Sequence, residues 1–219
     1  RKFISYIFAS NIPEAVPYIA YVLLSIPLPL TILQILAIDL GTDLFPALAL
    51  GAEAPSADVM KKPPRDPEER LLTTGLLVRT YLFLGPIEAF AGLFGFFFFL
   101  HMSGWHYGEI VPSNSMVYIQ ATTVCLGAVI MSQIGNVFAC RTFRASVFTI
   151  GIFSNRLVLS GVALEIVLAA LIIYSRPGNA FFGTAPVDGW IWLALVPFTF
   201  LILLAEEGRK MIVRKMRAA

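Results

Sequence analysis

Charged residues are scarce in this sequence. Of its 219 residues only 14% are Asp, Glu, Lys or Arg, whereas 58% are hydrophobic and the mean hydropathy is +0.78. Soluble domains average about 45–50% apolar and about 25% charged residues, so the composition excludes that class. A membrane-spanning helix needs about 20 mostly apolar residues, and the chain has room for six such helices with short connections.

Cysteines and phosphate-binding motifs are also few. The two cysteines, Cys125 and Cys140, fall in or beside apolar segments, and such spacing excludes a disulfide framework or a zinc cluster. The sequence has no Gly-Lys-Ser or Gly-Lys-Thr stretch and therefore no motif that cradles a phosphate. We expect that this chain alone cannot hydrolyse ATP, and we expect no nucleic-acid partner.

The expected fold is all-α, a polytopic membrane bundle of six transmembrane helices. The apolar segments lie near 3–27, 30–51, 76–102, 114–139, 155–175 and 189–206. Pro27 and Pro29 predict a tight turn between the first two spans. The expected parts are an ion-binding helix pair at 1–51, a cytoplasmic loop at 52–75, a four-helix membrane support domain at 76–206 and a basic cytoplasmic tail at 207–219.

The basic residues predict the orientation of the spans. If the helices alternate in direction, fifteen of the sixteen Lys and Arg residues fall on one side of the membrane, and only Arg176 falls on the other. Cytoplasmic loops carry an excess of positive charge. We therefore expect a multi-pass membrane protein with both termini in the cytoplasm.

Five carboxylates interrupt the apolar spans: Glu14, Asp39, Asp43, Glu88 and Glu165. An Asp near a helix centre costs about 2.5–3.5 kcal/mol on insertion scales, and no Lys or Arg lies deep enough in a span to pair with these acids. Bound cations are the simplest explanation. Protonation is the alternative, because a desolvated carboxylate tends to keep its proton, and for Glu88 and Glu165 both explanations stay open.

The residues of the first span favour bound cations over protonation as the explanation. Asn11 and Glu14 are three residues apart and share a helix face. Pro13 and Pro17 have no N–H, so the carbonyls of Ala9 and Pro13 lose their usual partners. A freed carbonyl in lipid is costly unless something binds it.

The second span shows the same combination of groups. Asp39, Thr42 and Asp43 lie on one helix face, Gly41 permits local unwinding, and Pro46 frees the carbonyl of Thr42. Carboxylates, an amide, a hydroxyl and loose carbonyls near the middle of the membrane are oxygen ligands for a hard cation. The sequence therefore predicts a cation site between the first two spans.

Short motifs across the chain resemble one family, the P-type ATPases of the second class, and within it the sodium/potassium and proton/potassium pumps. The resemblance rests on Ser-Asn-Ile-Pro-Glu at 10–14, Ile-Pro-Leu-Pro-Leu at 26–30 and Ile-Asp-Leu-Gly-Thr-Asp at 38–43. Residues 58–65 look like the loop after the sixth helix of these pumps, and 206–210 are similar to the end of the tenth. The chain would then be helices five to ten of a ten-helix transport domain.

The resemblance implies particular site residues. The cation-coordinating positions would be Ser10, Asn11, Glu14, Asp39, Thr42 and Asp43. Candidates for an accessory ion site are Tyr6, Glu88, Gln133, Asn136 and Glu165. Asn136 stands where the sodium/potassium pump has an Asp, which puts a third sodium ion in doubt. The expected cargo is Na⁺ or K⁺, with Ca²⁺ less favoured because calcium pumps usually have Asn at the position of Asp39.

The resemblance also implies what acts together with this chain. ATP and Mg²⁺ would bind to cytoplasmic domains upstream of residue 1, where the phosphorylated Asp of the family lies, and the fourth helix would add ligands. The partners would be the lipid bilayer and this N-terminal half of the pump. Residues 103–113 show no match to the segment that binds an accessory subunit in animal pumps, so we expect no such subunit.

Two other functions stay open from the sequence. A secondary transporter would also have acids at mid-membrane and broken helices, but it would need a second pseudo-symmetric half, and the Asn-x-x-Glu and Asp-x-x-Thr-Asp patterns do not recur in 76–219. A non-transporting membrane scaffold would keep its acids protonated. For the pump, we expect alternating access driven by aspartyl phosphorylation in the upstream domain.

Overall fold

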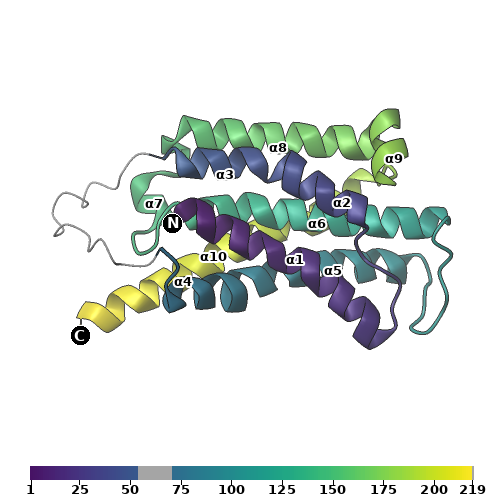
Figure 1. The fold of residues 1–219 in the computed structure, drawn as a ribbon, viewed down its shortest axis with the longest axis horizontal. Coiled ribbons are helices and arrows are strands. Elements are labelled where there is room, and N and C mark those ends of the chain that lie inside the picture. The colour runs from purple at the N-terminus through teal and green to yellow at the C-terminus, as the bar shows by residue number, and fades with distance from the viewer. Residues whose placement is uncertain (54–70, 219) are drawn as a thin grey trace.

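The structure is a bundle of long helices, and six of them are long and apolar enough to cross a membrane (Figure 1). It is a computed structural model that describes residues 1–53 and 71–218, and no strand occurs within those ranges. The six spans are Lys2–Leu24, Ile32–Gly51, Thr74–Met102, Met116–Cys140, Arg156–Tyr174 and Gly189–Met216. The predicted all-α bundle of six spans is confirmed. Most of the predicted loop at 52–75, with the motif at 58–65, lies outside the described residues.

The spans are assembled from the following elements. They are α1 (Lys2–Leu24), α2 (Ile32–Ala37), the π-helix η1 (Ile38–Thr42), α3 (Leu44–Gly51), α4 (Thr74–Arg79), the π-helix η3 (Thr80–Leu84), α5 (Gly85–Met102), α6 (Met116–Cys140), α8 (Arg156–Tyr174) and α10 (Gly189–Ala218). Three short elements lie in the links: α7 (Val147–Ile150), the 3₁₀ turn η4 (Ile152–Ser154) and α9 (Arg176–Phe182).

Two spans contain a widened turn, and each widened turn lies just before a proline. In the second span the amide of Asp43 donates to the carbonyl of Ile38 at 2.9 Å, which closes the π-helix three residues before Pro46. In the third span, η3 ends two residues before Pro86. A proline ring clashes with the carbonyl four residues earlier and removes a donor, so a π-bulge accommodates it. The unwinding predicted at Gly41 therefore takes the form of a wide helical turn.

The spans alternate in direction along the bundle (Figure 1). Both termini and α7 lie at one end, whereas the links after α1, α5 and α8 lie at the other. We call the end that holds the termini the terminal end. α1 stays helical through Pro13 and Pro17 and ends with Ser25 in the left-handed conformation at φ 49°.

The helix α6 forms the centre of the bundle, with α5 and α10 packed along it. Glycines permit these close approaches. A Cβ at Gly92 would lie 2.9 Å from Val129 Cγ2, and one at Gly95 would lie 2.9 Å from Ala128 Cβ. The helix α8 packs mainly on α3, where a Cβ at Gly161 would lie 3.1 Å from the backbone nitrogen of Pro46.

Gly135→Ala is expected to destabilise the bundle. A Cβ at Gly135 would overlap the carbonyl oxygen of Thr199 on α10 and lie 2.5 Å from Ile202 Cγ2. Because the nearest atom belongs to the backbone, α6 and α10 must move apart, at a cost of about 1–3 kcal/mol or more. The measurement is the thermal denaturation temperature in detergent, with Gly208→Ala as control, because a Cβ at Gly208 meets nothing within 4 Å. Equal denaturation temperatures for the two variants would show that α6 and α10 are not closely packed where they cross.

The last helix extends beyond the apolar run of the sixth span. The apolar run ends near residue 206, but α10 continues to Ala218 and includes most of the segment predicted as a tail. Hydropathy marks where a chain leaves the apolar region, and it does not mark where a helix ends. Glu206 and Lys210 are buried at this point and have hydrogen-bond partners, so the helix continues through its charged turn.

Candidate cation site

Asp43 is the centre of a buried polar cluster between the first two spans. It directly follows η1 and is 1% exposed. The hydroxyl of Tyr6, which comes from α1 and is fully buried, donates to Asp43 Oδ1 at 2.7 Å. Ser10 lies one turn further along α1 and beside Asp43, and its buried hydroxyl has no hydrogen-bond partner among the described residues. The wide turn of η1 thus places a carboxylate against a polar face of α1.

Glu14 and Asp39 lie at the edge of this cluster. Glu14 is half-buried, lies within electrostatic reach of Asp39 and Asp43, and has one carboxylate oxygen, Oε1, that is buried without a partner in the described chain. Asp39 is exposed, as is Asn11 on the neighbouring helix. Two polar side chains therefore stand on the outer surface of apolar spans.

The accessory candidates are also buried. Glu88 on α5, Gln133 and Asn136 on α6, and Glu165 on α8 all have exposed fractions of 0%. Glu88 and Glu165 lie within electrostatic reach of Asp43, and Asn136 lies beside Glu88. Glu88 and Glu165, which the sequence separated from Asp43, therefore share its electrostatic surroundings.

These accessory side chains are unusual because so many of their polar atoms lack partners. Both oxygens of Glu88 and of Glu165, both amide atoms of Gln133 and Nδ2 of Asn136 make no hydrogen bond to any described residue. Buried polar groups are nearly always bonded, and an unpaired buried polar group carries a large desolvation cost. Such a concentration of unpaired oxygens needs a ligand or a proton.

The chemistry of the cluster favours mixed oxygen ligands. Within the described ranges no group of three or more His, Cys, Asp and Glu side chains has an arrangement that could hold a metal ion. A hard cation here would therefore also need hydroxyl, amide or carbonyl oxygens, which are ligands that such ions accept. The Thr42 hydroxyl is buried and donates back to the carbonyl of Ile38 at 3.4 Å, and the carbonyl of Thr42 faces a helix turn that Pro46 leaves without a donor.

The structure brings together most, but not all, of the predicted residues. Ser10, Glu14, Asp43 and Tyr6 are neighbours, with Glu88 and Glu165 within electrostatic reach. Asn11 shares the α1 helix with Glu14 but is exposed, and Asp39 faces outward although it lies near Glu14. The assignment of these residues to a cation site stays a prediction.

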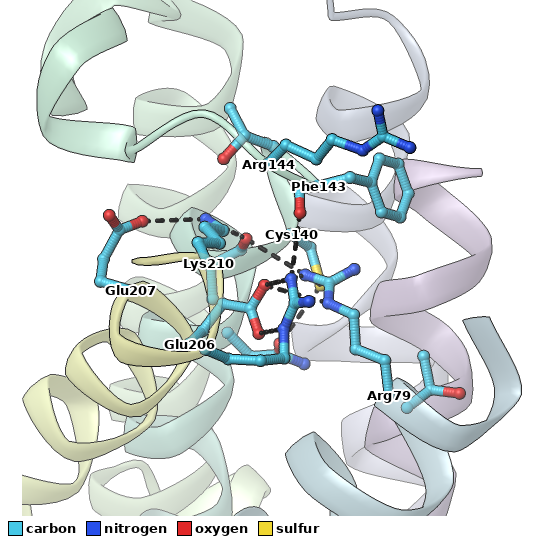
Figure 2. Close-up of polar contacts among 12 residues, drawn as sticks. Arg79, Cys140, Phe143, Arg144, Glu206, Glu207 and Lys210 are labelled. Atoms are coloured by element: carbon cyan, nitrogen blue, oxygen red, sulfur yellow. Dashed lines mark hydrogen bonds and ion pairs between the residues drawn. The ribbon is translucent and has the colours of Figure 1, made fainter. Parts of the chain in front are cut away.

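A second polar feature, which the sequence did not predict, lies at the terminal end (Figure 2). We call it the charge cluster, and its residues are Arg79, Glu206, Glu207, Arg209 and Lys210. Glu206 is fully buried and accepts from Arg79 Nε at 3.0 Å and from Arg209 Nε at 2.7 Å. The Arg79 guanidinium also lies over the ring of Phe143 at 5.0 Å.

The charge cluster also binds the end of α6. Arg79 Nη2 and Lys210 Nζ both donate to the carbonyl of Ala139, at 3.3 and 3.1 Å. Cations at a helix C-terminus satisfy its free carbonyls and complement its dipole. The sequence feature that could have predicted the charge cluster is the position of its residues. Arg79 and Glu206 each lie within about one turn of the terminal-end boundary of an apolar span.

A third polar feature, a group of ion pairs around Glu53, links the ends of three spans. Arg141 is 2% exposed and donates to Glu53 Oε1 at 2.9 Å, to the carbonyls of Gly151 and Ile152, and to Ser154 Oγ. Lys2 Nζ lies 3.5 Å from Glu53 Oε2. The start of α1 is therefore linked through Glu53 to the ends of α3 and α6.

Fold and site together define a multi-pass helical membrane protein with a carboxylate-rich interior. Residues 27–212 match the family model "Cation transporting ATPase, C-terminus". The chain therefore belongs to the cation-transporting ATPases, as a C-terminal membrane region of that family.

Named relatives agree with this assignment. The chain is 31% identical to the sodium/potassium-transporting ATPase subunit alpha-3 of Rattus norvegicus, over 98% of this chain and 24% of that protein. It is 31% identical to the alpha-4 subunit of the same organism and 30% identical to the alpha-2 subunit of Bos taurus, over 98% of this chain and 23% of each relative. The chain thus spans about a quarter of the length of these relatives.

Proposed function

We propose that this chain forms the ion-binding membrane part of an ATP-driven cation pump and that cations bind around Asp43. The main support is that the buried carboxylates of α5, α8 and the turn after η1, together with the half-buried Glu14 of α1, lie within electrostatic reach of one another, with no basic side chain among their recorded partners in the described chain. Several of their oxygens lack partners. Membership of the cation-transporting ATPase family supplies the reason for such a costly arrangement.

The proposed cargo is Na⁺ or K⁺, with Ca²⁺ as the alternative. The relatives are named for sodium and potassium transport, and the mixed oxygen set suits either ion. ATP and Mg²⁺ would bind to cytoplasmic domains of the longer pump. The exposed side chains of Asn11 and Asp39 would face a helix from the N-terminal half, which would complete the ligand set.

The proposed mechanism is alternating access. Phosphorylation of the cytoplasmic domain would tilt α1, whose first residues lie at the terminal end with the C-terminus. We place that end in the cytoplasm because the basic residues are concentrated there. Since Lys2 pairs with Glu53 at the end of α3, a tilt of α1 would also pull on the helix that carries Asp43. Release of the cation requires that its contacts with the protein differ between the states before and after phosphorylation.

The test is the cation dependence of phosphorylation from ATP in the full-length pump. Membranes containing the pump would be titrated separately with NaCl, KCl and CaCl₂, and phosphoenzyme would be measured at fixed ATP and Mg²⁺. We expect at least one cation either to raise phosphoenzyme or to drive its hydrolysis in a saturable manner. If neither the formation nor the hydrolysis of phosphoenzyme depends on any of the three cations, this function is excluded.

A further inference from the structure

A line of four buried side chains runs from Arg79 of the charge cluster to Glu88. Arg79 Nη2 lies 3.9 Å from Cys140 Sγ, and Cys140 Sγ lies 3.3 Å from Asn136 Oδ1. Asn136 in turn lies beside Glu88. Asn136 and Cys140 are one turn apart on α6, and all four side chains are 5% exposed or less.

The hydrogen bonds along these contacts run in one direction, from Arg79 through Cys140 to Asn136. A guanidinium can only donate, so the sulfur of Cys140 must accept from it. The thiol has one hydrogen, which is then directed to the carbonyl oxygen of Asn136. Because the oxygen of Asn136 accepts the hydrogen bond from Cys140, its amide nitrogen is the atom that remains available for other contacts. Consecutive hydrogen bonds in one direction polarise one another, which strengthens each of them.

The amide nitrogen of Asn136 and the carboxylate of Glu88 complement each other. Nδ2 of Asn136 and both oxygens of Glu88 are buried without partners among the residues that the structure describes. An amide N–H can stabilise a carboxylate but cannot bind a cation, because it has no lone pair to offer. If the amide were reversed, its oxygen would face the carboxylate and repel it.

We propose that Cys140 is a positioning residue of the cation site, holding the Asn136 amide with its nitrogen toward Glu88. Glu88 then supplies the anionic oxygen of the accessory region, and Asn136 is its donor and not a cation ligand. This inference rests on the proposed function and extends it, because it assigns separate roles to Glu88 and Asn136. It also assigns the fully buried Cys140 a role beyond packing.

The first test compares Cys140→Val with Cys140→Ser in the full-length pump. Valine fills a similar volume and neither donates nor accepts, whereas serine keeps both capacities. The affinity is measured for whichever of Na⁺, K⁺ and Ca²⁺ controls the wild-type phosphoenzyme. We expect Cys140→Val to lower the apparent affinity for that cation about three- to tenfold, as for the loss of one buried hydrogen bond. Cys140→Ser should stay within about twofold of wild type, and maximal phosphoenzyme should be unchanged in both.

Cys125 provides a matched control. It lies on the same helix, is equally buried and makes no hydrogen bond recorded within the described ranges. Cys125→Val and Cys125→Ser should leave the cation affinity unchanged. Equal affinities for Cys140→Val and wild type, or equal losses for Cys140→Val and Cys140→Ser, would overturn the positioning role.

A double-mutant cycle with Glu88→Gln tests whether Cys140 acts through Glu88. In the Glu88→Gln background we expect Cys140→Val to cause no further loss of affinity, because residues acting as one unit are not additive. The same loss in both backgrounds would contradict the inference. If these tests fail while Asp43→Asn still lowers the affinity, the proposed function stands without the positioning role. If phosphorylation and hydrolysis ignore all three cations, the proposed function fails and this inference fails with it.

Discussion

Asp43→Asn is expected to lower the apparent cation affinity of the full-length pump by about ten- to a hundredfold, because it removes the charged and desolvated carboxylate that we propose as a cation ligand. Asparagine has nearly the same shape, and its carbonyl oxygen can still accept from the Tyr6 hydroxyl that now bonds Asp43 at 2.7 Å. The fold should therefore survive while the negative charge is lost. The measurement is phosphorylation from ATP at increasing cation concentration.

Asp188→Asn is the control for this prediction, because Asp188 is an exposed acid in the link before α10. It should leave the cation dependence unchanged. An unaltered affinity in Asp43→Asn would remove Asp43 from the site. It would also leave its burial beside Tyr6 as a structural feature, with the carboxyl group protonated.

Glu206→Gln should produce the largest loss of stability among single substitutions in the charge cluster. The carboxylate is fully buried and holds two arginines, with Arg79 Nη2 2.9 Å and Arg209 Nη2 2.6 Å from Oε1. Neutralising it leaves Arg79 as an uncompensated buried cation, and breaking a buried pair in this way costs about 3–5 kcal/mol. Denaturation of the detergent-solubilised pump would measure the loss.

Glu109→Gln is the comparison for Glu206→Gln. Glu109 pairs with His106 at 3.4 Å, but both side chains are more than half exposed, and exposed pairs contribute little. We expect no measurable change in stability for this variant. Similar losses for Glu109→Gln and Glu206→Gln would mean that the charge cluster does not hold the helices together.

The sequence predicted the six-span helical fold well because long apolar runs depend on the membrane and only weakly on tertiary contacts. The acids in the spans were also recognisable, since their insertion cost is set by their surroundings. The resemblance separated Asp43 from Glu88 and Glu165, and the structure places them within electrostatic reach of one another. Pairwise packing of helices is long-range information that a single sequence does not contain.

Other features depended on details that periodicity does not show. The wide turns η1 and η3 arise from how each helix accommodates a proline, and a proline predicts a break without specifying its form. Arg79 was interpreted as one more basic residue on the cytoplasmic side, whereas it is buried against Glu206. The depth at which two helices meet decides whether such charges are solvated or paired, and only the structure shows it.

The close contact at Gly161 limits how α3 and α8 can move relative to each other. Because α8 approaches the backbone of α3 this closely, the two helices should travel as one rigid body. Asp43 and Glu165 would then keep their mutual spacing while both slide relative to Glu88 on α5. Any displacement of Asp43 relative to Glu88 would therefore carry Glu165 with it.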